Sequence, residues 1–283
     1  MTDRQHLVDV TGLRGELARS DPPTVLDVRW TLTGGGRADY ETGHLPGAPF
    51  LDLDAELAGP PGRGGRHPLP APEKLQGALR RLGVRAGHPV VVYDAGGAPP
   101  TGAAARAWWI MSWAGLTDVR VLDGGYAAWV AAGGPTTTEE PTPAPGDVTV
   151  TAGSMPVVDA AGARAVAADG VLLDARVPAR FRGETEPVDR VAGHVPGARN
   201  APAGGTVDDS GRLHPPEKLR ERFAGLGVRE DQPVAAYCGS GVSAAQSVLA
   251  LTLAGFRPAL YVGSWSEWIT DPARPVATGE EQA

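Results

Sequence analysis

The sequence repeats itself, and this repetition limits the folds that a chain of 283 residues can adopt. Four motifs occur twice and in the same order along the chain. The pairs are "GHLPGA" (43–48) with "GHVPGA" (193–198), "PEKL" (72–75) with "PEKL" (216–219), "LGVR" (82–85) with "LGVR" (226–229), and "DGGYAAW" (123–129) with "VGSWSEW" (262–268). Motifs that recur in one order indicate a tandem duplication, with each copy forming the same kind of domain.

The junction between the copies is visible in the composition. The stretch "GGPTTTEEPTPAPGD" (133–147) is rich in Pro, Thr and Gly and shows no apolar periodicity, which is typical of a linker. We therefore predict a first domain at residues 1–133, a linker at 134–148 and a second domain at 149–283.

Each copy alternates short apolar runs with helical segments. The expected strands are 24–29 and 89–93 in the first copy and 171–176 and 233–237 in the second. The expected helices are 72–83, 103–114, 216–227 and 243–254. This alternation predicts an α/β fold in which each domain is a parallel sheet with helices on both faces. Ligands of such sheets bind at the carboxyl ends of the strands, where Cys238 is expected.

Cys238 is the only cysteine, and it opens the loop "CGSGVSA" (238–244) between a strand and a helix. Gly239 and Gly241 allow a tight turn that directs backbone N–H groups to one point, and the helix N-terminus adds positive potential there. Such a cradle stabilises a thiolate, so Cys238 is a candidate nucleophile. The alternative is a buried, inert cysteine, which is a common role for a lone thiol.

The equivalent loop of the first copy differs. Asp94 stands where Cys238 would be, and Pro99 and Pro100 remove N–H donors. We therefore expect the first copy to be catalytically inactive.

Phosphate chemistry at Cys238 is disfavoured. Cysteine phosphatases hold phosphate with an arginine six residues after the nucleophile, and this position is Ala244. Residues 230–256 contain no arginine at all. A small loop without a fixed cation is better suited to a sulfur atom carried on Cys238 as a persulfide.

Composition excludes several other classes. A net charge of −7 argues against nucleic-acid binding, and the start "MTDRQHLVDV" has no apolar core of a secretory signal. The apolar stretch 103–116 is too short for a membrane span. A single cysteine and unpaired histidines predict no disulfide and no metal site. We expect a cytoplasmic protein with no metal or organic cofactor and no membrane or nucleic-acid partner.

Together the paired "GH-[LV]-PGA" motifs, "GSWSEW" (263–268) and "CGSGVSA" resemble the rhodanese superfamily, in particular its two-domain 3-mercaptopyruvate and thiosulfate sulfurtransferases. The resemblance spans about residues 7–133 and 149–278. It implies transfer of sulfur from a small donor through a Cys238 persulfide to cyanide, a thiol or a thioredoxin-like acceptor. Thiosulfate enzymes of the family carry basic residues after the cysteine, whereas Gly239 and Ser240 follow it here, as in the mercaptopyruvate enzymes. Two alternatives stay open: a thiosulfate:cyanide sulfurtransferase, and a persulfide carrier that turns over no small donor.

The resemblance also implies roles for individual residues. Arg180 matches a donor-binding arginine, Arg190 lies near the second expected arginine, and Arg182 could substitute for it; the alternative for each is a solvated charge. The loop residues Gly239, Gly241, Val242 and Ser243 would surround the bound sulfur. Ser240, His44 and Asp39 would form a catalytic group that protonates the departing pyruvate. For His44 the alternative is a purely structural role, because His194 occupies the same motif in the second copy.

The remaining features are expected to be structural. Trp108, Trp109 and Trp113 are predicted core residues, and Trp265 and Trp268 either pack in the core or line the site. The glycine-rich stretches "GGGR" (34–37) and "GPPGRGG" (59–65) are expected to be mobile loops.

Overall fold

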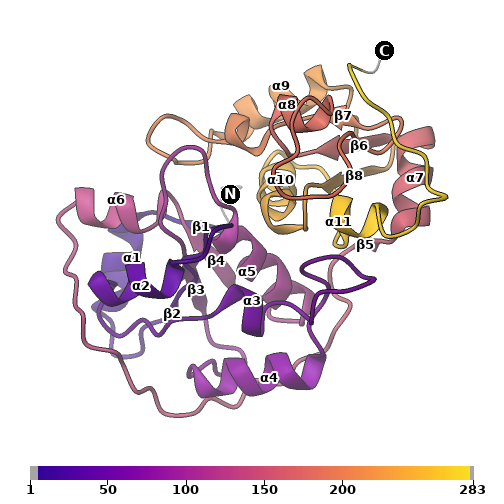
Figure 1. Ribbon diagram of the computed structural model, residues 1–283. Helices are drawn as coiled ribbons and strands as arrows, with labels where there is room; N and C mark the ends of the chain where they lie inside the picture. Colours follow the sequence, from indigo (N-terminus) through magenta and orange to yellow (C-terminus); the bar gives the residue numbers. More distant parts are fainter. Residues whose placement is uncertain (1–5, 281–283) are drawn as a thin grey trace. The chain divides into compact units, whose positions relative to one another are not determined.

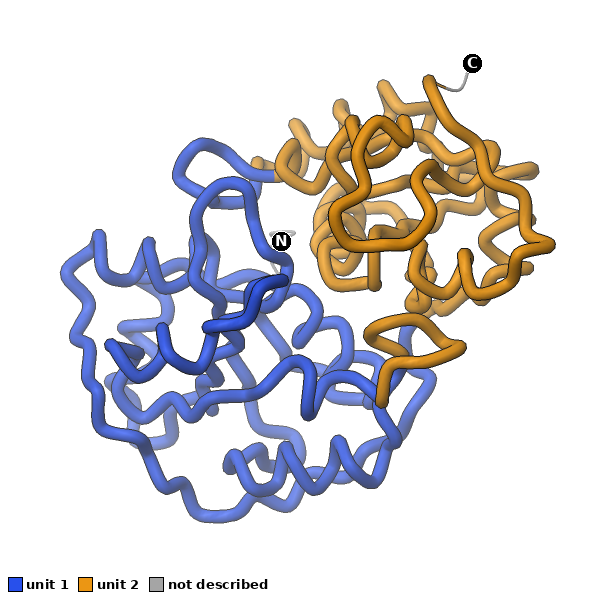
Figure 2. The backbone as a smooth tube through the Cα atoms, in the orientation of Figure 1, with its two compact units in different colours: residues 1–59, 69–155, 207–213 blue, residues 60–68, 156–206, 214–283 orange. Residues whose placement is uncertain are grey.

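The computed structural model describes residues 6–280 and divides into two compact units (Figure 2). Unit 1 comprises residues 1–59, 69–155 and 207–213, and unit 2 comprises 60–68, 156–206 and 214–283. Residues 1–5, which belong to the stretch expected to lack a secretory signal, lie outside the described residues.

The described part of unit 1 holds a four-stranded parallel sheet in the order β1-β4-β3-β2 (Figure 1). Its strands are β1 (Leu7–Val8), β2 (Thr24–Asp27), β3 (Val90–Tyr93) and β4 (Val119–Leu122). Its helices are α1 (Val10–Leu17), α2 (Gly36–Thr42), α3 (Leu53–Glu56), α4 (Pro72–Arg81), α5 (Ala103–Trp113) and α6 (Gly125–Ala131).

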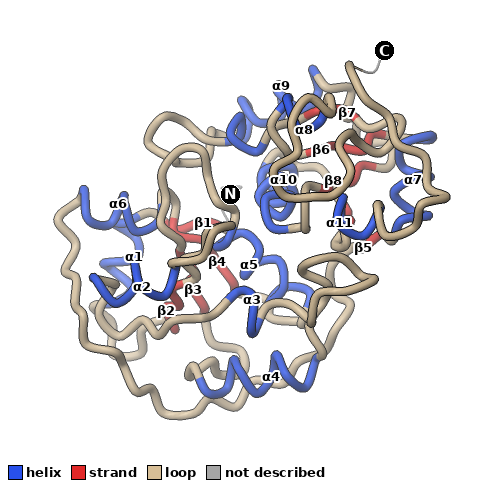
Figure 3. Tube along the Cα trace, viewed as in Figure 1, coloured by secondary structure: helices blue, strands red, loops and turns tan. Residues whose placement is uncertain are grey.

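Unit 2 repeats this plan with a five-stranded parallel sheet in the order β5-β9-β8-β6-β7, and Figure 3 shows the alternation of helices and strands. Its strands are β5 (Val157–Val158), β6 (Val171–Asp174), β7 (Arg199–Asn200), β8 (Val234–Tyr237) and β9 (Ala259–Tyr261). Its helices are α7 (Ala160–Asp169), α8 (Pro178–Phe181), the 3₁₀ helix η1 (Ala203–Thr206), α9 (Pro216–Gly225), α10 (Val242–Leu253) and α11 (Ser264–Trp268).

The predicted α/β fold with parallel sheets is confirmed. The central strands β3 and β8 are buried at every residue, as expected for parallel strands covered on both faces. Helix α5 is almost wholly buried, and its Trp108, Trp109 and Trp113 belong to the core as predicted. The remaining predicted strands and helices agree with the structure to within a few residues at their ends.

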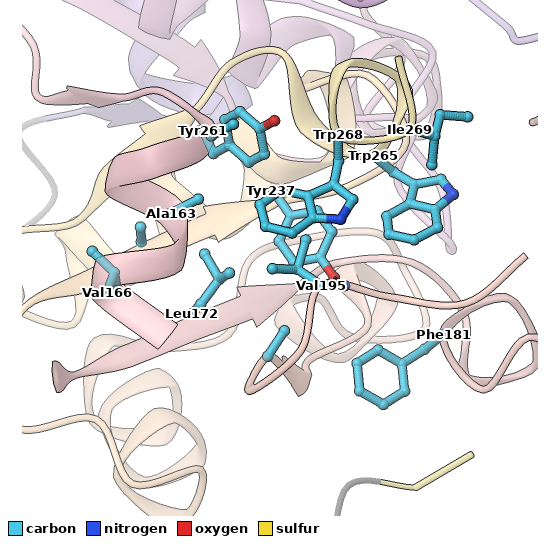
Figure 4. Close-up of a cluster of buried hydrophobic side chains, with 13 residues drawn as sticks. Ala163, Val166, Leu172, Phe181, Val195, Tyr237, Tyr261, Trp265, Trp268 and Ile269 are labelled. Carbon is cyan, nitrogen blue, oxygen red and sulfur yellow. Dashed lines mark hydrogen bonds between the residues drawn. The ribbon is translucent and has the colours of Figure 1, made fainter. Parts of the chain in front are cut away.

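Aromatic side chains fill one side of the unit 2 sheet (Figure 4). Tyr237 and Tyr261 from the strands pack with Trp265 and Trp268 from α11, and all four are at most 1% exposed. The indole Nε1 of Trp265 donates to the carbonyl oxygen of Val191, and that of Trp268 donates to Pro275, both at 2.9 Å. The two tryptophans are therefore core residues whose polar atoms are satisfied.

The duplication is also visible in buried polar contacts. An ion pair two residues apart follows β2 and β6: Arg29 with Asp27 at 2.8 Å, and Arg176 with Asp174 at 2.6 Å. All four side chains are at most 5% exposed, so each charge is compensated where water is excluded. Each pair tethers the chain leaving the carboxyl end of its strand.

The stretch expected to be a linker is held against unit 1. The N–H of Gly146 donates to the carbonyl oxygen of Arg80 at 2.7 Å, and Arg80 Nε donates to the carbonyl of Val148 at 2.8 Å. His44 and Thr137 exchange backbone hydrogen bonds at 2.9 Å. The stretch thus forms an extended strap along unit 1, although no helix forms within it.

Two short segments belong to the unit formed mainly by the other half of the chain. Residues 60–68 belong to unit 2, and residues 207–213 belong to unit 1. Within the first segment Gly62 and Gly65 exchange backbone hydrogen bonds at 2.9 and 3.0 Å. The segment expected to be a mobile loop therefore forms a hydrogen-bonded turn within unit 2.

Candidate active site

Cys238 lies immediately after β8, and α10 begins four residues later at Val242. Gly241 adopts a φ of +84°, a conformation that glycine accepts without steric cost. Its N–H lies 3.1 Å from the Cys238 Sγ and donates to it. Cys238 is 3% exposed and Ser240 is 5% exposed, so the sulfur lies in a nearly dry cradle at a helix N-terminus.

The segment that follows β9 fixes the cysteine loop. Trp265 N–H donates to the carbonyl oxygen of Cys238 at 3.0 Å, and Ser266 N–H donates to that of Gly239 at 2.9 Å. The Cys238 N–H donates to Ser264 Oγ at 3.2 Å, and this hydroxyl donates to the Tyr261 carbonyl at 2.9 Å. Cys238 is thus held through its N–H, its C=O and its Sγ.

Ser264 has an unusual backbone conformation. Of the described residues other than glycine, it alone has a positive φ, at +54°. The equivalent residue of unit 1 is Gly125, with a φ of +59°. A side chain in this region costs conformational energy, and such strain is concentrated at functional sites. Unit 2 therefore carries a strained serine whose hydroxyl accepts the Cys238 N–H.

The corresponding loop of unit 1 is filled by its own carboxylate. Asp94 accepts hydrogen bonds from the N–H groups of Gly96 at 3.0 Å and Ala104 at 3.2 Å, and from the Thr101 hydroxyl at 3.0 Å. The loop of unit 1 is thus occupied by a fixed anion, whereas in unit 2 the Gly241 N–H faces the Cys238 sulfur.

Arg180, at the end of α8, reaches the cysteine loop. A Cβ placed on Gly239 would lie 3.6 and 3.7 Å from the two terminal nitrogens of Arg180. The guanidinium is also bound to acidic partners: Nε and Nη2 donate to Glu186 at 3.1 and 2.6 Å, and Nη2 donates to Asp189 at 3.1 Å.

Arg66 is a second cation at this loop, and the sequence interpretation missed it. Its Nη2 lies 2.7 Å from the same Cβ position on Gly239. Its backbone N–H donates to Ser266 Oγ at 3.0 Å, and its guanidinium forms an ion pair with Asp189. The expectation of a loop without a fixed cation is therefore wrong, because the cations come from segments distant in sequence.

A signal for Arg66 exists in the repeat. "GRHP" (65–68) and "GRLHP" (211–215) stand just before the two "PEKL" motifs, so an arginine recurs at the same place in both copies. The next residue, His67, is 8% exposed and also belongs to unit 2.

The other two predicted arginines have different partners. Arg190 Nη2 donates to the carbonyl oxygen of Ile269 at 2.6 Å. Arg182 donates through Nε to Glu184 at 2.7 Å on the exposed side of the segment. Of the three predicted donor-binding arginines, Arg180 is the one that lies against the loop at Gly239.

His44 and Asp39 belong to unit 1. His44 is fully buried, its Nδ1 and Nε2 lie 3.0 and 3.1 Å from the carbonyl oxygens of Tyr40 and Glu139, and its ring stacks on Tyr40 at 3.8 Å. His194 repeats this arrangement: Nδ1 lies 2.7 Å from the Phe181 carbonyl, and the ring stacks on Phe181 at 3.7 Å. The Asp39 side chain is exposed. These contacts support the structural alternative for His44.

The Glu186 carboxylate beside Arg180 has a lowered pKa. Burial alone would raise the pKa of Glu186, but the Arg180 guanidinium and the N–H groups of Asp189 and Val188 hold it below its ordinary value. Because this pKa is lowered in the folded state, the stabilisation that Glu186 provides is present at neutral pH. It is lost as the pH falls through the lowered pKa.

These features define a candidate thiol-based active site: a cysteine at a strand–loop–helix junction, beside guanidinium groups, in one of two duplicated α/β units. Among residues 6–280 no cluster of three His, Cys, Asp or Glu side chains could hold a metal ion. No described helix is long and apolar enough to cross a membrane.

Comparison with known families identifies the class. The rhodanese-like domain matches residues 11–132 and again residues 159–271, so the chain belongs to the rhodanese-like family. The predicted resemblance is confirmed.

Individual relatives carry more specific names. A Pseudomonas aeruginosa protein named as a 3-mercaptopyruvate sulfurtransferase is 49% identical over 90% of this chain and 92% of its own length. A Mycobacterium tuberculosis protein named as a thiosulfate sulfurtransferase, SseB, is 46% identical over 97% and 98%. The crystal structure of the 3-mercaptopyruvate sulfurtransferase SseA from Escherichia coli superposes with a TM-score of 0.79 at 32% identity, covering 92% of this chain and 99% of that one.

Proposed function

We propose that this protein is a sulfurtransferase that takes sulfur from 3-mercaptopyruvate through a persulfide on Cys238. The observation that carries the proposal is the Cys238 sulfur at the N-terminus of α10, facing the Gly241 N–H, with Arg180 against the same loop. The names of the relatives from P. aeruginosa and E. coli support the same donor.

The reaction proceeds in two transfers. The Cys238 thiolate attacks the donor sulfur and forms the S–S bond, while the carbon–sulfur bond breaks and its electron pair stays on carbon. The resulting pyruvate enolate takes up a proton. A thiolate acceptor or cyanide then attacks the outer sulfur and restores the Cys238 thiolate, so the kinetics are ping-pong.

Different residues of unit 2 bind the sulfur, bind the donor and supply the proton. The loop from Gly239 to Ser243 surrounds the bound sulfur, and the Gly241 N–H stabilises its negative charge. Arg180 binds the donor carboxylate, for which its planar fork is suited. Ser240 and His67 are the proton-donor candidates of this unit; the contacts of His44 support a role in ordering the "GHLPGA" turn.

Partners and compartment follow from the same chemistry. The donor is a small anion, and the acceptor is a small thiol or a thioredoxin-like protein. A single reactive thiol must stay reduced between turnovers, which supports a location in the reducing cytoplasm.

The test is steady-state sulfur transfer to cyanide, measured as kcat/KM for 3-mercaptopyruvate and for thiosulfate. We expect a preference for 3-mercaptopyruvate and a loss of at least about a thousand-fold in Cys238→Ser, because the nucleophile is removed. Activity that survives in Cys238→Ser would refute the mechanism. Persulfide loading by transfer of the outer sulfur from a polysulfide or a small-molecule persulfide, with no turnover of 3-mercaptopyruvate or thiosulfate, would instead indicate a sulfur carrier.

Thiosulfate is the second candidate donor. Arg66 and Arg180 bring two guanidinium groups to Gly239, and the M. tuberculosis relative is named for thiosulfate. A higher kcat/KM for thiosulfate than for 3-mercaptopyruvate would establish this alternative.

A further inference from the structure

Asp189 connects the two cations that lie against the cysteine loop. One carboxylate oxygen pairs with Arg66, and the other accepts from Arg180 Nη2 at 3.1 Å. The side chain is only 4% exposed, and its backbone N–H donates to Glu186 at 3.0 Å. The carboxylate is therefore fixed between both guanidinium groups.

The surrounding charges balance. Three arginines meet three carboxylates in one connected set, made of Arg66, Arg176, Arg180, Asp174, Glu186 and Asp189. The set thus brings two cations to the loop of Cys238 without a net positive charge. Removing one member would leave an uncompensated charge close to the nucleophile, where it acts strongly on an approaching ion.

We propose that Asp189 is a specificity-determining residue: its carboxylate cancels the positive charge that Arg66 and Arg180 bring to the Cys238 loop. The site then favours a monoanionic keto-acid donor and discriminates against a dianion such as thiosulfate. The choice of donors rests on the proposed function, whereas the charge balance at Cys238 is testable without it.

Alkylation of Cys238 measures this charge directly. Iodoacetate and iodoacetamide both react by thiolate displacement of iodide, and they differ in the negative charge of the acetate group. Because Cys238 is the only cysteine, the mass gain of the whole protein reports this site alone. The ratio of the two rate constants cancels any change in the thiolate fraction.

Variants that change the local charge in opposite directions should shift the alkylation ratio in opposite directions. Asp189→Asn leaves a net positive charge and should raise the iodoacetate-to-iodoacetamide ratio about five-fold, the effect of one unit charge at roughly 4 Å in water. Arg66→Gln leaves a net negative charge and should lower the ratio by a similar factor. Both shifts should shrink at high salt.

Matched controls separate the local charge from the charge of the whole protein. Glu230→Gln and Arg220→Gln make the same charge changes in an exposed ion pair of unit 2 and should leave the ratio unchanged. Asp189→Glu retains the charge and should keep the wild-type ratio. Should Asp189→Asn fail to fold, Arg66→Gln tests the proposal from the other side.

The proposal is overturned if Asp189→Asn, or in its absence Arg66→Gln, leaves the alkylation ratio at the wild-type value. It is also overturned if Asp189→Glu shifts the ratio as much as Asp189→Asn does. In turnover assays the thiosulfate-to-mercaptopyruvate ratio of kcat/KM should rise in Asp189→Asn. If neither donor is turned over by the wild type, the proposed function fails while the alkylation result stands.

Discussion

At the scale of single residues, the backbone of Cys238 is held by a serine in a strained conformation. Ser264 has a φ of +54°, and its hydroxyl accepts the Cys238 N–H at 3.2 Å. Unit 1 has Gly125 at this place with nearly the same φ. The serine therefore carries a conformational cost at the position where its hydroxyl contacts Cys238, as strain at functional sites does.

Replacing Ser264 should separate stability from activity. Ser264→Gly relieves the strain but loses the hydroxyl, so we expect an unchanged or higher Tm and a kcat about 3- to 10-fold lower, the range of one hydrogen bond. Ser264→Ala keeps the strain and should lower both quantities. Thermal unfolding and steady-state transfer measure the two effects, and a wild-type kcat in Ser264→Gly would show that the hydroxyl does not position Cys238.

At the scale of elements, the turn at residues 60–68 determines where Arg66 lies. Gly65 has a φ of +95°, and a Cβ there would lie 2.6 Å from the Gly263 carbonyl oxygen and 2.8 Å from Ser266 Oγ. Only glycine permits this close approach to the segment that also holds the Cys238 loop.

A methyl group at Gly65 should displace this turn. We expect Gly65→Ala to lower kcat/KM about ten-fold or more and to lower Tm, because both the space and the φ disfavour a side chain. Gly62→Ala is the matched control: its Cβ would meet nothing within 4 Å, and its φ is not positive. Equal losses in the two variants, measured by kinetics and thermal unfolding, would contradict the role of the Gly65 contact.

At the scale of the whole molecule, one fold occurs twice, and the loop after the central strand carries different residues in the two copies. The loop of unit 1 holds Asp94 with three satisfied donors, while the loop of unit 2 holds a thiol and two nearby guanidinium groups. Duplication preserved the buried Asp–Arg pairs and stacked histidines, which serve folding in both copies.

Moving the thiol to the first copy should therefore fail to move the activity. In the double variant Asp94→Cys and Cys238→Ser we expect transfer to cyanide below about 1% of wild type, because the loop of Asp94 contains Pro99 and Pro100 and lacks their N–H groups. The single variant Asp94→Cys should keep the Cys238 activity but lower Tm, since three donors lose a carboxylate acceptor. Substantial transfer by the double variant would show that the cysteine alone defines the site.

The sequence by itself determined the duplication, the parallel α/β fold and the position of Cys238. Those features follow from repeated motifs, apolar runs and glycine spacing, which are local properties of the chain. The sequence also identified Arg180 as a candidate site residue, because it stands in a motif of the family.

Only the tertiary structure decided the electrostatics of the site. Arg66 lies far from Cys238 in sequence. The sequence also gives no sign that Asp189 pairs with both Arg66 and Arg180, which only the folded chain shows. The structural alternative for His44 gains its support from the tertiary structure, in which both ring nitrogens face backbone carbonyls. Charge compensation and burial depend on distances between segments remote in the chain, and a linear pattern does not contain those distances.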